Sequence, residues 1–139
     1  MHTIALTVRF CETDALGHIN NTSYFIYLEE GRVKFFESLG LGISTEDWNF
    51  ILASTTCDFK AQGYFNDRLS VHTSVSTVGN KSFVLTHEIK RTETGELIAK
   101  GSATLVYFDF KKQTTESIPD DVRTVLAQHG ERKPVESES

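Results

Sequence analysis

Five polar residues with chemically useful side chains lie within ten positions of one another, directly before a helix-like segment. They are Glu12, Asp14, His18, Asn20 and Asn21. A helix start offers unpaired N–H groups and a partial positive charge, which can stabilise an oxyanion. An Asp seven residues before that start could attack a carbonyl carbon or activate water. The pattern therefore indicates acyl transfer, but Asp and Asn are also common in caps and loops, and spacing alone leaves both interpretations open.

The segment that follows this cluster has the period of a helix. Apolar residues recur every three or four positions over 22–39, with Asn21 or Thr22 as the expected N-cap and Gly40 just past the end. Gly31 in the interior should cost about 1 kcal/mol relative to Ala. We expect its benefit to be a close approach to a sheet.

Five segments alternate between apolar and polar residues as strands do, and a connector over 41–49 precedes the second of them. The strand-like segments are 3–10, 50–60, 68–78, 82–92 and 97–110. Gly79-Asn80 and Thr94-Gly95 stand where hairpin turns belong, which predicts an antiparallel meander for the last three strands. Pro119 begins a short helix. The pattern predicts an α+β fold with a long helix against a five-stranded sheet, and the uncovered sheet edges favour a homodimer or a dimer of dimers.

Length and composition limit the classes of function. The 139 residues predict one domain over 1–130, with a charged, Ser-rich and frayed tail over 131–139. A net charge of −5 argues against nucleic-acid binding, and no apolar run is long enough to cross a membrane. Without an export signal, Cys11 and Cys57 are expected to be free thiols in the cytoplasm. No His or Cys pair has metal-ligand spacing, so we expect no metal.

The run Asp-x-x-Gly-His-x-Asn-Asn-x-x-Tyr over 14–24, preceded by Val8-Arg9-Phe10-Cys11-Glu12-Thr13, resembles the opening signature of a known enzyme family. That family is the hotdog-fold acyl-CoA thioesterases of the 4-hydroxybenzoyl-CoA thioesterase type. The stretches 66–69 and 78–83 resemble further turns of the same family. The resemblance covers residues 3–110 and implies a five-stranded antiparallel sheet wrapped around a long central helix.

The resemblance also implies roles for individual residues. The catalytic carboxylate falls on Asp14, and the backbone N–H that polarises the thioester carbonyl falls at or beside Asn21. Some relatives carry a His just before the helix, where this chain has Asn21; its own His18 comes earlier, which leaves a catalytic role for His18 open. Apart from the resemblance, substrate contacts are expected at Gly17, at Tyr24 and Tyr64, and at Lys81 and Ser82. Core packing explains the two tyrosines equally well, and a lysine at a strand edge more often serves solubility than phosphate binding. The substrate is an acyl-CoA held at a dimer interface, and no separate cofactor is implied.

Several alternatives stay open at this point. Another branch of hotdog thioesterases uses a carboxylate on the central helix, which would correspond to Glu29 or Glu30, although a solvated pair is the more common role of such residues. A non-catalytic hotdog module that binds acyl-CoA or a lipid would keep the fold without turnover. The hotdog dehydratases are disfavoured, because the His motif expected at the start of their helix is not visible here. The sequence decides neither the acyl group nor whether the thiol carrier is coenzyme A or acyl carrier protein.

Overall fold

The computed structural model describes residues 1–40 and 49–130. The predicted tail over 131–139 and all but the last residue of the predicted connector over 41–49 lie outside the described residues. The elements, in chain order, are β1 (His2–Thr7), the 3-10 turn η1 (Phe10–Glu12), α1 (Asn21–Ser38), β2 (Phe50–Phe59), β3 (Arg68–Val78), β4 (Ser82–Arg91), β5 (Leu97–Asp109), β6 (Thr114–Thr115) and α2 (Asp120–Ala127).

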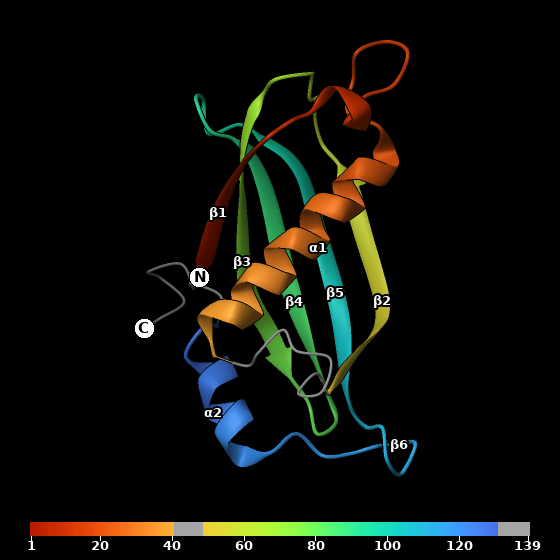
Figure 1. Cartoon of the computed structure of the whole chain (residues 1–139). Coiled ribbons are helices and arrows are strands. Elements are labelled where there is room, and N and C mark those ends of the chain that lie inside the picture. Colours follow the sequence, from red (N-terminus) through yellow and green to blue (C-terminus); the bar gives the residue numbers. More distant parts are fainter. Residues whose placement is uncertain (41–48, 131–139) are drawn as a thin grey trace.

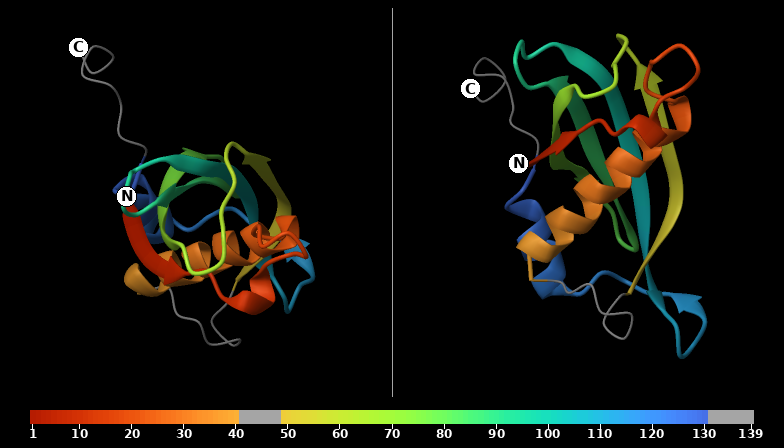
Figure 2. Two further views of the ribbon diagram at one scale, coloured as in Figure 1. Left: turned by 90° about the horizontal axis from the view of Figure 1, so that it is seen from above. Right: turned by 45° about the horizontal axis from the view of Figure 1, so that its top comes forward.

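The strands form one antiparallel sheet in the order β1-β3-β4-β5-β2, with the two-residue β6 added to β5 (Figure 1). Strands β3, β4 and β5 follow one another as a meander, as the turn residues predicted. Strand β2 pairs with β5, so β1 and β2 are the two edges of the main sheet. The sheet curls around α1, which crosses it diagonally (Figure 2). This arrangement confirms the expected α+β hotdog fold and adds one short strand, β6.

Helix α1 is positioned by a cap at each end and by an apolar face. The side chain of Asn20 caps its start, and Gly40 follows its end with φ +73° and an N–H that donates to the Glu37 carbonyl (3.0 Å). Four large side chains of its inner face are almost fully buried: Tyr27, Leu28, Phe35 and Phe36. Burial of each such side chain stabilises the fold by about 1.5 to 3 kcal/mol, which makes packing the main reason the helix lies where it does.

The predicted close approach at Gly31 is confirmed. A methyl group there would lie 2.9 Å from Cγ1 of Val71 and 3.2 Å from Oγ1 of Thr73. Only a residue without a side chain lets α1 lie this near β3.

The core beneath α1 consists of two apolar clusters. One, around Tyr24, Tyr27 and Leu28, lies toward the helix start, and the other, around Phe35 and Phe36, toward its end. Between them on the sheet stand two inward-facing polar residues, Thr73 on β3 and His87 on β4, both fully buried. Helix α2 extends the second cluster with the buried Leu126, and Pro119 is its N-cap.

The first strand is shorter than the alternation predicted. It ends at Thr7 instead of Phe10, and the Phe10 side chain is 77% exposed in η1. The reason is local: the backbone N–H of Arg9 donates to the Glu12 carboxylate (2.8 Å), which turns the chain away from the sheet.

Candidate active site

Asp14 lies in a loop that folds back on itself between η1 and α1. Its Oδ1 atom accepts hydrogen bonds from the backbone N–H groups of Leu16 (2.9 Å) and His18 (3.1 Å), and its own N–H donates to the His18 carbonyl (2.8 Å). The residue is exposed, and no hydrogen bond from the described residues reaches Oδ2. One carboxylate oxygen is therefore anchored, while the other accepts no hydrogen bond from the described residues.

Gly17 gives this loop its shape through its backbone. Its φ of +79° lies in the left-handed region that favours glycine, and its N–H donates to the Asp14 carbonyl (3.0 Å). Its carbonyl accepts from the N–H of Phe65 (3.3 Å), which ties the loop to the segment after β2. The structure thus assigns Gly17 a part in holding Asp14 in place.

The ring of His18 packs edge-on against the ring of Tyr64, with centroids 5.3 Å apart. Its contact with Asp14 is made by its main chain, and the structure records no hydrogen bond from the imidazole to a described residue. Tyr64 is about half exposed, and its N–H donates to Asp67. A catalytic role for the His18 ring stays a prediction.

The start of α1 follows this loop directly. The N-cap is Asn20 and not Asn21 or Thr22: its Oδ1 accepts from the N–H of Thr22 (3.1 Å). Both asparagines can cap a helix, and the chain geometry selects the first. Asn21 is the first helical residue, and no hydrogen bond is recorded from its N–H to any described residue. An N–H at a helix start that lacks an intrahelical partner is the kind of group that can stabilise an oxyanion.

A cavity of about 300 Å³ opens beside the helix start, between α1 and the end of β2. It is lined by Ile19, Asn21, Tyr24, Phe59, Lys60, Ala61 and Gln62. The buried ring of Tyr24 packs on Phe59, with centroids 5.1 Å apart, and burial raises the pKa of Tyr24 against the opposing effect of a hydrogen bond from the Gly63 backbone. The cavity thus combines aromatic walls with one lysine, and Asp14 lies outside its lining.

Lys81 and Ser82 lie far from the other predicted site residues within one protomer. Lys81 lies in the turn between β3 and β4 and Ser82 is the first residue of β4, whereas the Asp14 loop is at the opposite end of the sheet (Figure 1). Lys81 is exposed, and its carbonyl accepts from the N–H of Tyr107 (2.9 Å). A single copy of the chain does not bring this turn to Asp14.

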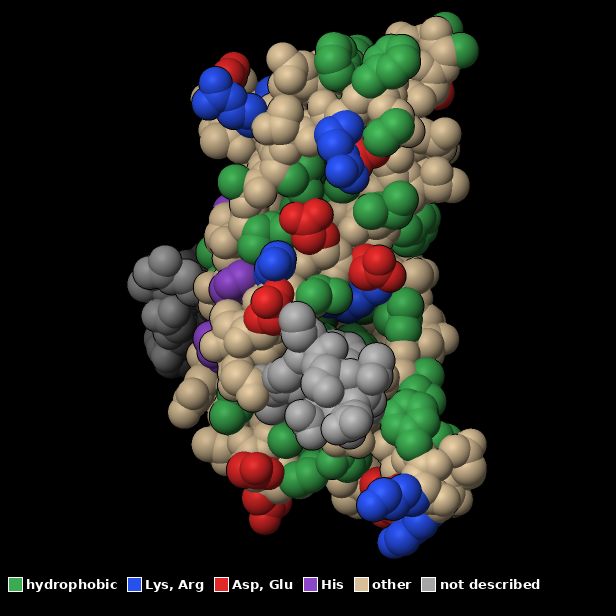
Figure 3. Space-filling view, viewed as in Figure 1, with side chains coloured by type: hydrophobic (Ala, Val, Ile, Leu, Met, Phe, Trp, Pro, Cys, Tyr) green, Lys and Arg blue, Asp and Glu red, His purple; other side chains and the backbone are tan. Residues whose placement is uncertain are grey.

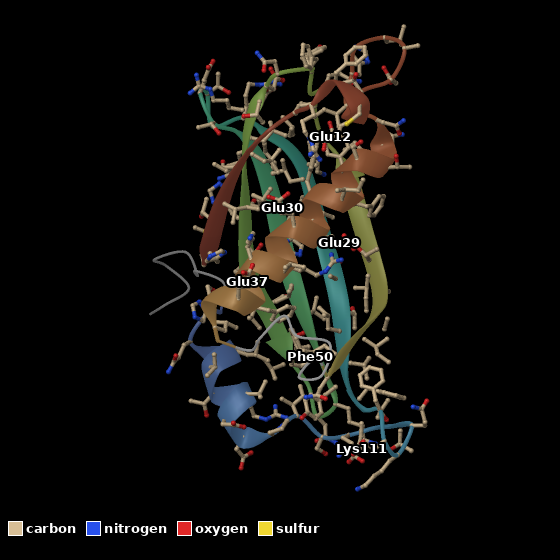
Figure 4. The ribbon with its side chains drawn as sticks, in the orientation of Figure 1. Glu12, Glu29, Glu30, Glu37, Phe50 and Lys111 are labelled. Atoms are coloured by element: carbon tan, nitrogen blue, oxygen red, sulfur yellow. The ribbon has the colours of Figure 1, made fainter. Side chains whose placement is uncertain are left out.

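Three of the acidic residues near α1 lie at two different places along the helix. Glu29 and Glu30 are exposed along the middle of the helix, while Glu12 lies at its start (Figure 4). Acidic and basic side chains are interspersed on this face of the molecule (Figure 3). Glu12 is 6% exposed and is the only buried carboxylate among the described residues. The sequence placed Glu12 in the polar cluster but did not reveal its burial. The feature that could have indicated it is Arg9, three positions earlier, because that spacing brings the two side chains together.

The remaining features concern the two thiols, metal ligands and membrane spans. Both cysteines are free thiols; Cys11 is exposed, and burial together with Asp58 raises the pKa of Cys57 to about 11, which makes it unreactive at neutral pH. Within residues 1–40 and 49–130, no three His, Cys, Asp or Glu side chains are grouped so that they could hold a metal ion. In that same part of the chain, neither helix has the length and apolarity needed to span a bilayer.

Comparisons with known proteins cover most of the chain. The model of the thioesterase-like superfamily matches residues 8–126. The YsmA protein of Bacillus subtilis, which is uncharacterized, is 31% identical over 121 residues, covering 87% of this chain and 82% of that protein. The structure of a predicted thioesterase from Bacillus stearothermophilus superposes with a TM-score of 0.87 at 32% identity, covering 95% and 98% of the two chains. That of the BH1999 gentisyl-coenzyme A thioesterase superposes with a TM-score of 0.79 at 29% identity, covering 91% and 99%.

Proposed function

Because the chain belongs to the thioesterase-like superfamily, we propose that it hydrolyses an acyl-CoA thioester to a free carboxylic acid and coenzyme A. The observation that carries the proposal is that two groups suited to this reaction lie at the same end of the molecule (Figure 1). A carboxylate anchored by one oxygen precedes a helix whose first N–H has no described partner. The similarity to a gentisyl-coenzyme A thioesterase supports coenzyme A as the thiol carrier.

In the proposed reaction, the thioester carbonyl oxygen accepts a hydrogen bond from the Asn21 N–H, and the positive end of α1 stabilises the developing oxyanion. Asp14 then acts in one of two ways. As a nucleophile, its Oδ2 attacks the carbonyl carbon, the coenzyme A thiolate leaves, and water hydrolyses the resulting mixed anhydride. As a base, Asp14 takes a proton from water, which attacks directly. Both routes yield one acid and one thiol per water consumed.

The remaining predicted site residues have supporting parts in this proposal. Gly17 shapes the Asp14 loop, the buried Tyr24 lines the cavity that would hold the acyl group, and the Tyr64 ring packs against the ring of His18. Coenzyme A carries several phosphates, for which Lys81 and Ser82 are the proposed partners.

A second copy of the chain would bring Lys81 and Ser82 to the site. Strand β2 is an edge of the sheet and carries exposed apolar side chains at Ile51, Leu52 and Phe59. If two β2 strands pair antiparallel about a two-fold axis, the Phe50 end of one lies beside the Phe59 end of the other. The Lys81 turn is at the Phe50 end and the helix start is at the Phe59 end. We therefore propose a homodimer, or a dimer of dimers, with the substrate bound between protomers.

A direct assay tests the proposal. The protein is incubated with aromatic and straight-chain acyl-CoA substrates and with an acyl-acyl carrier protein, and free thiol is measured. We expect thiol release from at least one acyl-CoA, and slower release from the acidic carrier protein, since the chain has a net charge of −5.

The non-catalytic binding module predicts another result. It would bind acyl-CoA in calorimetry without releasing thiol from any substrate, and that result would refute the enzyme. Light scattering in the same buffer tests the oligomer, where a mass of one chain would contradict the shared site. The cytoplasmic location stays a prediction from the sequence.

A further inference from the structure

Glu12 combines burial with an unusually complete set of hydrogen bonds. Its Oε1 accepts from the Arg9 N–H (2.8 Å) and from the Tyr27 hydroxyl (3.0 Å), and its Oε2 accepts from Nε (3.1 Å) and Nη2 (2.7 Å) of Arg9. Burial acts to raise the pKa of Glu12, but the hydrogen bonds from Arg9 and Tyr27 together outweigh it and lower the pKa. The carboxylate is therefore ionised at neutral pH, and every partner donates to it.

The main chain of Glu12 is held as firmly as its side chain. Its carbonyl oxygen accepts from the N–H of Asn20 (2.9 Å) and from the hydroxyl of the buried Ser23 (2.9 Å). Asn20 is the N-cap of α1, Ser23 lies in its first turn and Tyr27 in its second. One residue thus joins the end of η1 to the cap and to both of the first two turns of the helix.

The position of Glu12 in the chain gives these contacts a consequence for the reaction. Asp14 follows two residues later, and the loop that carries it closes on the Asp14–His18 and Asp14–Gly17 hydrogen bonds. That loop has its own internal geometry, but Glu12 decides where the loop begins relative to the helix start. A displacement of about 1 Å between reacting groups can cost a hundredfold in rate.

We propose that Glu12 is a positioning residue, whose ionised carboxylate, held between Arg9 and the Tyr27 hydroxyl, fixes Asp14 relative to the N-terminus of α1. The inference rests on the proposed hydrolase function. It concerns neither substrate binding nor proton transfer: Glu12 acts through Asp14, and its four donors leave it no capacity to act as a base.

Two substitutions test this role with little change in volume. In Glu12→Gln, the amide places an N–H against a donor, whichever way it is turned, and the negative charge is lost. Tyr27→Phe removes only the hydrogen bond from the helix side. Glu93→Gln, an exposed glutamate in the turn between β4 and β5, is the matched control. We expect Glu12→Gln to lower kcat by about tenfold to a hundredfold with KM within about threefold, Tyr27→Phe to lower kcat less, and Glu93→Gln to lower neither.

A double-mutant cycle separates positioning from a general loss of structure. If Glu12 acts through Asp14, then Glu12→Gln should not lower the residual rate of an Asp14→Ala variant any further. An equal fold-loss in both backgrounds, a loss confined to KM, or an unchanged kcat in a folded Glu12→Gln protein would overturn the inference. Should Glu12→Gln fail to fold, an unchanged kcat in Tyr27→Phe would overturn it instead.

The same measurements distinguish this inference from the function on which it rests. A wild-type protein that hydrolyses no thioester, or an Asp14→Ala variant with full activity, refutes the proposed reaction and the inference with it. An active wild type that depends on Asp14 but not on Glu12 refutes the inference alone.

Discussion

Helix α1 meets buried polar groups at two places, and the two are built differently. At its start, the Glu12 carboxylate accepts four hydrogen bonds from Arg9 and Tyr27. At its middle, His87 has one partner, the Thr73 hydroxyl (2.8 Å), and neither its Nε2 nor the buried Nη1 of Arg32 has a hydrogen-bond partner among the described residues. A satisfied buried network fixes geometry, whereas unsatisfied buried groups cost stability.

This difference predicts a division along α1 between a start that serves the reaction and a middle that serves stability. The start holds a rigid polar arrangement where chemistry is proposed, and the middle is a polar layer between two apolar clusters. Changes at the middle should therefore alter mainly the free energy of unfolding, and changes at the start should alter mainly kcat. Four predictions, from the largest expected effect to the smallest, test this division.

Gly31→Val should have the largest effect on stability. Its side chain would overlap Val71 and Thr73, and such overpacking costs about 2 to 3 kcal/mol. Urea denaturation measures the loss. A variant as stable as wild type would show that the helix can move off the sheet at little cost, which contradicts the close packing described here.

Acid should destabilise the protein through His87, in the polar layer at the middle of α1. Burial, with a smaller contribution from Arg32, lowers the pKa of His87 to about 3, against 6.5 in the unfolded chain. Between those values only the unfolded chain binds the proton, so stability is lost as pH falls below about 6.5, by up to about 1.4 kcal/mol per pH unit. At pH 4.5 this amounts to roughly 2 to 3 kcal/mol.

His87→Gln provides the control for the acid effect. It removes the titrating group, so the stability of the variant should depend less on pH between 4.5 and 6.5 than that of wild type. Equal slopes in urea denaturation series would show that His87 does not titrate as its burial requires.

Asn20→Ala, at the start of α1, should have a smaller effect on stability. It removes the cap that accepts from the Thr22 N–H, which costs about 1 kcal/mol of stability. Because the cap lies at the proposed site, kcat should fall by a larger factor than in Gly31→Val, measured for both well below their melting temperatures. The reverse order would contradict the division.

Glu29→Gln and Glu30→Gln should have the smallest effects. Both side chains are exposed, about two turns from Asn21, so each variant should keep kcat within about twofold and stability within about 0.5 kcal/mol. A large loss of kcat would move the catalytic carboxylate to the middle of the helix and favour the mechanism of the other thioesterase branch.

Much of this architecture could be predicted from the sequence because the signals are local. The strand alternation gave the bounds of β3 correctly. The pairing of β2 with β5 could not be predicted, because hairpin turns link only neighbouring strands and this contact joins distant segments. The two-residue β6 is too short to leave a pattern.

The candidate site was predicted in part for the same reason. Asp14 and Asn21 stand out by type and spacing, but the cap at Asn20 required the local geometry. In the sequence, Glu12 resembles any other polar loop residue. Its importance follows only from its contacts with Arg9 and with Tyr27, which is fifteen positions away. The separation of Lys81 from Asp14 within one protomer depends on the sheet topology, which motif spacing does not contain.

The most direct test of the proposed site is the turnover of Asp14→Asn on the best acyl-CoA substrate. The amide oxygen of Asn can still accept from the Leu16 and His18 N–H groups, so the loop keeps its anchor while the charge is lost. We predict that kcat falls about a thousandfold, equivalent to about 4 kcal/mol, with an unchanged melting temperature. A folded Asp14→Asn variant that keeps kcat within about twofold of wild type would contradict the account.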